Sequence, residues 1–232
     1  MKLCGQIILD YQEDSFRRVV DMGTIRHQTK SRTVTIHYDH KNVPLDFLVV
    51  DSDRVRKYCM DCPNHDHKWS CPPACDLLPE NYKRIILYWA WIDASDFGGV
   101  QNKEYIKVRA MNAILVSITN QIGHPLATMM VGRFLSSGSC KLCHPCTYPD
   151  QCKRPERAYQ SLESTGIDIV RTMKKLDFKL PWYGKKKINQ NYTHGTVVCG
   201  VLTNHDGGGG YVEKMFKRLD IKTKEKKLSE WI

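Results

Sequence analysis

The segment YKRIILYWAWID, residues 82–93, decides the fold of this chain. It is almost entirely apolar and rich in isoleucine, tyrosine and tryptophan, which favour strands. We therefore expect it to form a central strand of a sheet. Other predicted strands are RTVTIHY at 32–38, which alternates between polar and apolar residues, LDFLVV at 45–50, and GTVVCGVLTN at 195–204.

Helical periodicity begins near Lys103 and replaces the strand pattern. Met111, Leu115, Ile118 and Ile122 recur at the spacing that places them on one face of a helix. A helix with one apolar face needs a partner to cover that face. We therefore expect it to pack against the sheet.

The tripeptide GHP at 123–125 combines glycine with proline, so we expect it to end this helix. A second helix is predicted through Met129, Met130 and Arg133 to Leu135, where SSGS stops it. Later helices are predicted for three segments: ERAYQSLEST at 156–165 after Pro155 in a first turn, IDIVRTMKKL at 167–176 after a break at Gly166, and YVEKMFKRL at 211–219.

These elements predict a mixed α/β (α+β) fold, in which helices pack against a small sheet. We expect a single domain over residues 1–232, because the globular pattern is continuous and shows no repeat. Cysteine loops occupy residues 59–75 and 140–152, and the second is expected to lie between helices. A basic C-terminal segment follows from about residue 179.

The composition is typical of a reduced, cytoplasmic protein. Hydrophobic residues make up 41% of the 232 residues, enough for a sizeable core, and no apolar run is long enough to span a membrane. The segment MKLCGQIILDYQEDSF at 1–16 turns acidic too early for a signal peptide. We therefore expect a cytoplasmic location and no membrane partner. Thiols stay reduced there, so clustered cysteines are more often ligands or catalysts than disulfides.

Eight of the ten cysteines fall in two groups, and Cys4 and Cys199 stand apart. Cys199 lies in the apolar run TVVCGVLT, where a buried, inert thiol is expected. The second group, GSCKLCHPCTYPDQCKRP, contains Cys140, Cys143, Cys146 and Cys152.

Three cysteines at x2 spacing, followed by a fourth near a proline, resemble the bacterial ferredoxin run C-x2-C-x2-C-x3-C-P. Such a short loop points three sulfurs toward three corners of a 4Fe–4S cubane. Here the last gap is five residues, and Pro155 comes three residues after Cys152. Zinc, the alternative, usually takes cysteines in separated C-x2-C pairs. The spacing therefore favours a 4Fe–4S cluster, with zinc as the alternative metal.

The first group, CMDCPNHDHKWSCPPAC at 59–75, leaves its ligand number open. Cys59, Cys62 and Cys71 offer three thiolates, and Cys75 offers a fourth. Four ligands would close a structural zinc site or a second cubane. Three ligands would leave one iron of a cubane open to water, substrate or sulfide.

His65 and His67 lie between the second and third cysteines of this group. They are candidate catalytic residues that could donate protons to a molecule at an open iron, or candidate ligands. The alternative is that both are polar loop residues. Trp69 is expected to pack over the site and exclude water, and basic residues such as Arg54, Arg56 or Lys68 could attract an anionic substrate.

The two groups together resemble a family of small prokaryotic predicted metal-binding proteins, domain-of-unknown-function family 2284. The matching pattern is C-x2-C-P-x-aromatic-Gly-x-x-Trp-x-C-P-P, then G-x-C-x2-C-x2-C-x5-C-x2-P-E, then a Ser-x-Glu-x-x-Gly-Ile-Asp segment that begins here at Ser161. The resemblance runs from about Leu45 to about Phe178, more than half of the chain.

This resemblance implies iron–sulfur or other metal binding in a cytosolic protein, often of anaerobes, and it implies no established reaction. The chain departs from the family pattern at NHDHKW, residues 64–69, where the pattern has an aromatic–Gly pair. Cys75 is an addition to the pattern. Both differences fall in the first group, so the resemblance does not fix its ligand number.

The net charge of +10 raises the alternative of nucleic-acid binding. Much of the excess lies in KKLDFKLPWYGKKK and KMFKRLDIKTKEKK near the C-terminus, and such charge runs are usually solvated faces. We therefore do not expect nucleic acid to be the partner. The loop Gly207–Gly210 could cradle an anion before the last helix, although such loops are more often flexible surface turns.

Two classes of function remain. The first is an iron–sulfur protein with one or two 4Fe–4S clusters, in which the second group relays electrons. The first group would then act on a small-molecule substrate, or exchange electrons with a redox partner protein, as in an oxidoreductase or a sulfur-handling enzyme. The alternative is a zinc-stabilised binding module, for example for nucleic acid. The cysteine triple at x2 spacing favours iron.

Overall fold

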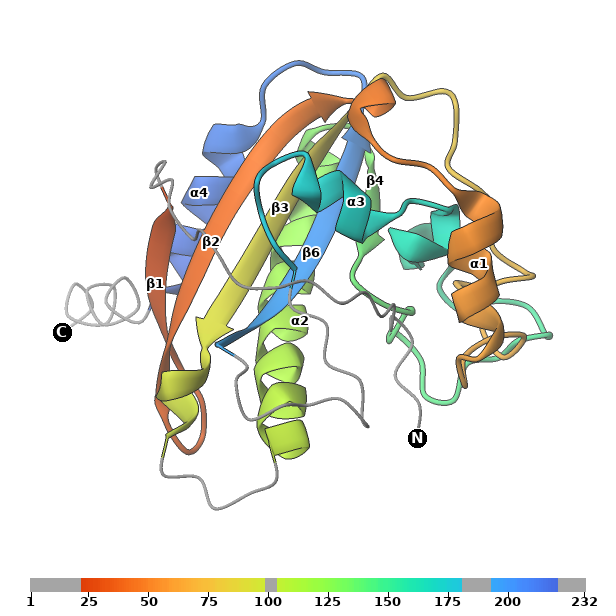
Figure 1. Cartoon of the computed structure of the whole chain (residues 1–232). Coiled ribbons are helices and arrows are strands. Elements are labelled where there is room, and N and C mark those ends of the chain that lie inside the picture. Colours follow the sequence, from red (N-terminus) through yellow and green to blue (C-terminus); the bar gives the residue numbers. More distant parts are fainter. Residues whose placement is uncertain (1–21, 99–103, 181–192, 221–232) are drawn as a thin grey trace, which may run out of the picture.

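The computed structural model describes residues 22–98, 104–180 and 193–220 and contains a six-stranded sheet with helices on both faces (Figure 1). The predicted mixed α+β fold is confirmed. The strands are β1 Gly23–Gln28, β2 Thr33–Pro44, β3 Arg84–Asp93, β4 Arg133–Ser136, β5 Gln160–Ser161 and β6 His194–Thr203. The helices are α1 Ser52–Met60, α2 Glu104–Met129, α3 Ile169–Lys174 and α4 Gly209–Leu219.

The strand order in the sheet is β1-β2-β3-β6-β4-β5. All neighbours are antiparallel except β4 and β5, which are parallel. The segment that contains β3 pairs with β2 on one side and β6 on the other, so the predicted central strand is confirmed. β3 and β6 are buried on both faces, which explains their unbroken apolar sequences. β2 alternates because it buries mainly one face.

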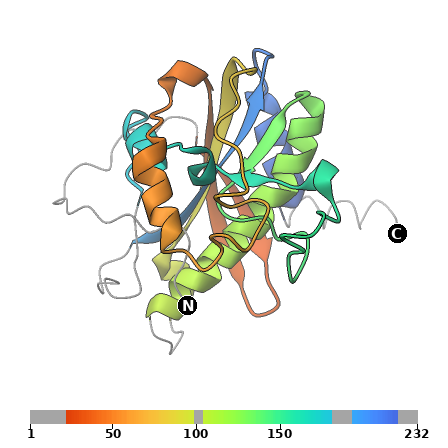
Figure 2. The same cartoon turned by 90° about the vertical axis from the view of Figure 1, so that its right-hand side faces the viewer.

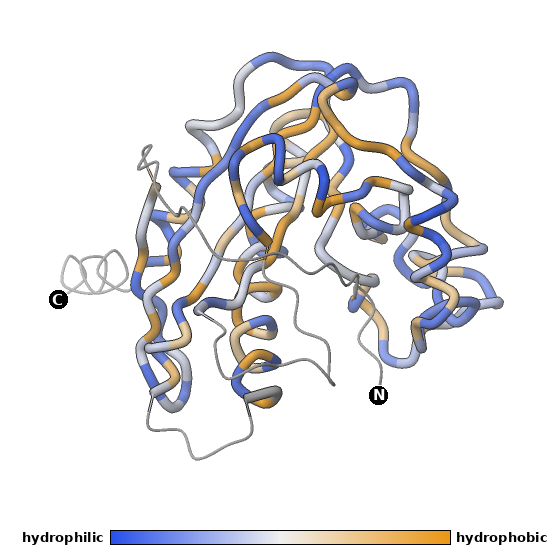
Figure 3. Tube along the Cα trace, viewed as in Figure 1, coloured by the Kyte–Doolittle hydropathy of each residue, from blue (hydrophilic) through white to orange (hydrophobic). Residues whose placement is uncertain are grey.

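Each face of the sheet has its own apolar cluster. α2 and α4 cover one face, where the rings of Tyr38 in β2 and Phe216 in α4 stack with centroids 4.0 Å apart (Figure 1). On the other face, Trp89 and Trp91 of β3 share a cluster with Met173 of α3. Figure 3 shows hydrophobic residues concentrated in the sheet and hydrophilic residues in the outer loops. Burial of this apolar surface is the main force that holds the layers together.

Helix α2 does not end at GHP as predicted, although the apolar face predicted for it is buried. Pro125 faces solvent, whereas Ile122 and Leu126 continue the buried face across it. Packing of this face offsets the cost of a proline inside a helix, about 3 kcal/mol. Gly123 allows close packing instead of ending the helix, because a Cβ there would lie 2.1 Å from the Phe134 ring.

The second helix predicted through Met129 to Leu135 is wrong, because Met129 is the last residue of α2 and the residues after it form a turn and then strand β4. α2 ends in a Schellman turn, in which Gly132 N–H donates to Ala127 O at 2.8 Å and Val131 N–H donates to Thr128 O at 3.3 Å. Val131 has a left-handed φ of 46°. A Cβ on Gly132 would lie 2.0 Å from a backbone oxygen of β6, so glycine is required where the chain enters the sheet.

The strand predicted for LDFLVV is also wrong. Leu45–Phe47 form a 3₁₀ turn, and Val50 makes only an isolated bridge. The pairing of β2 with β3 ends at Pro44, so this segment has no neighbouring strand to join. Its apolar side chains pack against the second cluster through Leu45, Phe47 and Leu48.

The helix predicted for ERAYQSLEST is replaced by β5 with a 3₁₀ turn on either side. Ser161 N–H donates to Ser164 Oγ at 3.1 Å, and Ser164 N–H donates to Ser161 Oγ at 3.0 Å. These local bonds compete with helical ones. Gly166 separates the two elements as predicted, with a left-handed φ of 93°. Helices α3 and α4 and strand β6 match their predicted segments.

α1 and the two cysteine loops lie together beside the β4–β5 end of the sheet, the side that faces the viewer in Figure 2. The second loop leaves strand β4, so it does not lie between helices as predicted. The fold thus places both cysteine groups on one side of the molecule. Within the described ranges, none of the helices has the length and apolar character needed to cross a membrane.

Candidate metal centre

Helix α1, which was not predicted from the sequence, positions the first cysteine. The Asp51 side chain caps it by accepting a hydrogen bond from Arg54 N at 3.3 Å. Val55 and Cys59, one turn apart, are its buried residues. The helix ends at the next residue, and Cys62 N–H donates to Cys59 O at 3.0 Å. This turn keeps the first two cysteines of the group close together.

The rest of the first loop folds back through short turns. Asp66 N–H donates to Pro72 O at 2.9 Å, which closes the loop between the second and third cysteines. Cys75 N–H donates to Cys71 O at 3.2 Å, so these two cysteines are one turn apart. The cysteines of the first group are all nearly inaccessible, with exposed fractions of 6% for Cys59, 7% for Cys62, 4% for Cys71 and 5% for Cys75.

Three sulfurs of the first group have a hydrogen-bond donor nearby, and as a thiol Cys75 Sγ also donates to Ser164 O at 3.6 Å. Cys62 Sγ accepts from Asn64 N at 3.4 Å and from Asn64 Nδ2 at 3.7 Å. Arg56 Nη2 lies 3.9 Å from Cys75 Sγ, and Ser70 Oγ lies 3.9 Å from Cys71 Sγ. A metal-bound thiolate can only accept hydrogen bonds, and donors of this kind tune metal–thiolate sites. These donors are therefore of the kind that suits an iron–sulfur cluster held by thiolates.

The four thiols of the first group also lie within electrostatic reach of one another. Burial raises the pKa of Cys71 to about 12, and the neighbouring Cys62 and Cys75 add to the increase. Burial also raises the pKa of Cys75, Arg56 opposes that increase, and Cys59 adds to it. Without metal, Cys71 and Cys75 are therefore protonated at neutral pH, so a metal must displace their protons.

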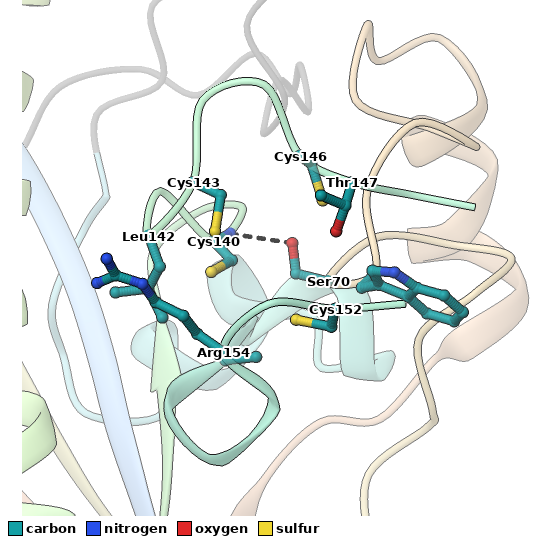
Figure 4. Close-up of a pocket in the computed structure, with 10 residues that line it drawn as sticks. Ser70, Cys140, Leu142, Cys143, Cys146, Thr147, Cys152 and Arg154 are labelled. Atoms are coloured by element: carbon teal, nitrogen blue, oxygen red, sulfur yellow. Dashed lines mark hydrogen bonds between the residues drawn. The ribbon is translucent and has the colours of Figure 1, made fainter. Parts of the chain in front are cut away.

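The four cysteines of the second group line one pocket (Figure 4). Each is partly exposed. Figure 4 shows Cys140, Cys143, Cys146 and Cys152 around the pocket, with the Ser70 hydroxyl among them. The lining also includes Trp69, Leu142, Thr147, Arg154 and Ala158.

Positive charge is concentrated at this pocket. Arg154 lines it, Lys68 Nζ donates to Cys140 O, and Lys141 is the next residue in the chain. Burial lowers the pKa of Lys141, and the nearby Lys68 ammonium lowers it further. Cationic groups this close together favour a bound anionic centre, such as a metal held by four thiolates.

The two cysteine loops contact each other directly. Lys68 Nζ donates to Ser139 Oγ at 3.2 Å and to Cys140 O at 3.3 Å. Cys140 N–H donates to Ser70 Oγ at 2.9 Å. Trp69 Nε1 donates to Asp150 O at 2.8 Å.

A second aromatic residue completes the contact between the loops. The Tyr148 hydroxyl donates to Asp66 Oδ1 at 2.9 Å, and the rings of Tyr148 and Trp69 meet edge to face at 5.1 Å. Trp69 was expected over the first group, but it lines the pocket of the second. The two cysteine motifs, read separately in the sequence, do not indicate that their loops lie against each other.

Tyr159 anchors the second loop to the sheet and to α2. Its hydroxyl accepts from Lys141 N at 3.0 Å and from Asn120 Nδ2 at 3.2 Å. Asn120 Oδ1 in turn accepts from Ser136 Oγ at 2.8 Å. Burial raises the pKa of Tyr159, so the phenol stays neutral. Ser70 and Tyr159 were both missed from the sequence, because neither belongs to a metal-ligand pattern.

His65 and His67 lie in the first loop, and neither lines the pocket of the second cysteine group. His65 is half-buried, and His67 is exposed, with its Nδ1 2.7 Å from Asp66 O. Their catalytic role stays a prediction. Cys199 is fully buried in β6, as expected for an inert thiol.

Other candidate features are described only in part. Gly207 and Gly208, with φ values of 90° and 94°, precede α4, and an anion-binding role for Gly207–Gly210 stays a prediction. Among the residues with described positions, no three histidine, cysteine, aspartate or glutamate side chains are close enough to hold a single metal ion. Cys4 and residues 181–192 and 221–232 of the basic C-terminal segment lie outside the described residues.

The model of the family described as "Predicted metal-binding protein (DUF2284)" matches residues 45–202. This is more than half of the chain, so the chain belongs to that family. The match includes both cysteine loops and the contacts between them. No curated protein and no solved structure gives a significant match. Metal binding is therefore supported by the family and by the two cysteine groups together.

Proposed function

We propose that this chain holds two 4Fe–4S clusters, one at each cysteine group, and functions in electron transfer. One observation carries the proposal: eight cysteines form two adjacent groups, one buried behind α1 and the other around a pocket. Thiolates are soft ligands, which suit iron–sulfur clusters, zinc and copper(I). The triple at x2 spacing from Cys140 to Cys146 supports iron, because zinc sites usually separate their cysteines into two pairs.

The second group is the proposed electron relay. A 4Fe–4S cluster would supply one-electron transfer there. The partly exposed cysteines are near enough to the surface to serve a redox partner protein. Trp69 and Leu142 present apolar surface to the pocket and limit the access of water. Lys68 and Lys141 lie near Cys140 and offset the negative charge of the thiolates.

In the first group we propose Cys75 as the fourth ligand, beside Cys59, Cys62 and Cys71. Its burial with the other three and its electrostatic interaction with Cys59 support this assignment. Arg56 holds it in place by donating to its carbonyl oxygen at 2.9 Å as well as to its sulfur.

The alternative for the first group has three ligands and one open iron. His65 and His67 would then supply protons to a small-molecule substrate, as in an oxidoreductase or a sulfur-handling enzyme located in the cytoplasm. The two versions differ in one residue, Cys75. Its substitution therefore distinguishes them.

The decisive experiment is to purify the protein without air and to measure iron, acid-labile sulfide and zinc per chain. We expect brown protein that contains iron and sulfide in equal amounts. Cys143→Ala should lower the iron content by about half, because one of two clusters is lost. Cys199→Ala is the matched control, because it removes a buried cysteine outside both groups.

Colourless protein that contains zinc but no sulfide would contradict the iron–sulfur proposal and favour the zinc-stabilised binding module. Equal iron in the wild type and Cys143→Ala would contradict a cluster at the second group. Protein that binds no metal under any of these conditions would contradict both functions.

A further inference from the structure

The second metal site is built partly from the first loop. Residues 68–70 precede Cys71, yet Trp69 and Ser70 line the pocket of the second group. The first loop also holds both backbone groups of Cys140. Ser70 Oγ accepts from Cys140 N at 2.9 Å, and Lys68 Nζ donates to Cys140 O at 3.3 Å.

Ser70 also interacts with a ligand of the first group. Its hydroxyl is 3.9 Å from Cys71 Sγ, and the residue is 4% exposed. When Cys71 is a metal-bound thiolate, the hydrogen of this pair must come from the hydroxyl, because a thiolate has none. The same oxygen can still accept the Cys140 N–H. One side chain thus joins a ligand of the first group to a ligand of the second.

We propose that the two cysteine groups bind metal cooperatively, and that Ser70 and Lys68 are the positioning residues that couple them. Metal at the first group orders the loop 59–75 and so fixes Ser70 and Lys68. The second loop then loses less conformational entropy when its own metal binds. Such a coupling is reciprocal, so metal at the second group favours metal at the first by the same factor.

This inference rests on the proposed function only in that both groups bind metal, and it does not depend on which metal. Co²⁺ added to the reduced, metal-free protein is therefore a suitable probe, because it binds thiolates reversibly. Alkylation of the thiols, measured peptide by peptide, reports the occupancy of each group separately. We expect Cys62→Ser to weaken Co²⁺ binding at the second group about five-fold or more, and Cys143→Ser to weaken the first group by the same factor.

The double variant Ser70→Ala/Lys68→Ala tests the route of the coupling. In this background, Cys62→Ser should no longer affect the second group, since the connection is already lost. Ser70→Thr, which keeps the hydroxyl, should retain most of the effect. Ser137→Ala is the matched control: its hydroxyl is next to the second loop but has no hydrogen-bond partner in the described part of the chain.

Equal Co²⁺ affinity of the second group with and without Cys62 would overturn the inference and leave the proposed function intact. Coupling that persists in the Ser70→Ala/Lys68→Ala background would overturn the role of these two residues. If that variant does not fold, the Cys62→Ser and Cys143→Ser comparison still tests the coupling in the natural background. A wild-type chain that binds neither Co²⁺ nor iron would overturn both proposals.

Discussion

Val131 holds a conformation that its side chain disfavours. It is β-branched, has a φ of 46° and ends α2 with 77% of its surface exposed. A left-handed φ costs a residue other than glycine about 1–2 kcal/mol, which a glycine at position 131 would not have to meet. Glycine is also more flexible in the unfolded chain, which reduces that stabilisation by about 0.5–1 kcal/mol. We expect Val131→Gly to raise the free energy of unfolding by up to about 1 kcal/mol in urea titrations.

Val131→Thr serves as the control, because threonine is also β-branched and gains nothing at this φ. Little burial is lost in either variant, since the side chain is mostly in solvent. A lower free energy of unfolding for Val131→Gly would contradict this account.

Cys75 decides between the two versions of the first group. Because Cys75 is buried and interacts electrostatically with Cys59 and Cys71, we expect Cys75→Ala to lose the metal of the first group and to keep that of the second. Metal content and the electron spin resonance of the reduced protein report the result, with Cys199→Ala as the reference. An intact cluster whose signal changes when a small ligand is added would instead support the open iron.

The sequence predicts candidate ligands of the site better than it predicts their surroundings. Spacing and composition identified both cysteine groups, because metal-ligand patterns are local in sequence. The bond from Cys140 N to Ser70 Oγ joins residues 70 positions apart, and the contact of Lys141 N with Tyr159 depends on the path of β4 and β5. No local pattern encodes such contacts.

At the scale of elements, Tyr159 links the second loop to α2 and β4. Tyr159→Phe removes a hydroxyl that accepts from Lys141 N and Asn120 Nδ2. Buried groups that lose a partner cost about 1–3 kcal/mol. We expect a decrease of that size in the free energy of unfolding, together with weaker metal binding at the second group.

Tyr148→Phe is the matched control for Tyr159→Phe. It removes a hydroxyl that bonds to the exposed Asp66, and water can hydrate the Asp66 carboxylate in its place. Equal decreases in the free energy of unfolding in the two variants would show that the buried network around Tyr159 stabilises the fold no more than an exposed hydrogen bond does.

Pro125 in α2 provides a second test at this scale. Pro125→Ala restores a backbone N–H in the helix and removes the ring from the carbonyl of Gln121. We expect an increase in the free energy of unfolding of about 1–3 kcal/mol, because proline is about 3 kcal/mol less favourable than alanine inside a helix. Gln121→Ala, on the preceding turn, should change it far less. A destabilised Pro125→Ala would mean that packing requires the bend at proline.

The helices and strands also show where local sequence patterns are enough to predict secondary structure. β3 and β6 were predicted because burial on both faces demands unbroken apolar runs. GHP and LDFLVV were misinterpreted for a common reason, since their structures depend on packing. The apolar spacing that continues from Ile122 to Leu126 was a usable signal that the helix passes through Pro125.

At the scale of the whole molecule, metal sites and apolar layers should differ in their response to chelation. The two apolar clusters lie on the faces of the sheet, and the cysteine loops lie beside its β4–β5 end. We expect metal removal to increase hydrogen exchange first in residues 59–75 and 139–155, while amides of β3 and α2 stay protected. Simultaneous loss of protection in all four segments would contradict this separation.

The position of β6 has a consequence for synthesis on the ribosome. β1, β2 and β3 emerge early and can pair in sequence, but the other edge of β3 pairs with β6, whose His194 faces Asp93. Until β6 is synthesised, an apolar strand is left with an open edge, which is a template for aggregation. A chain stopped before His194 should be insoluble, although it contains all eight cysteines of the two groups.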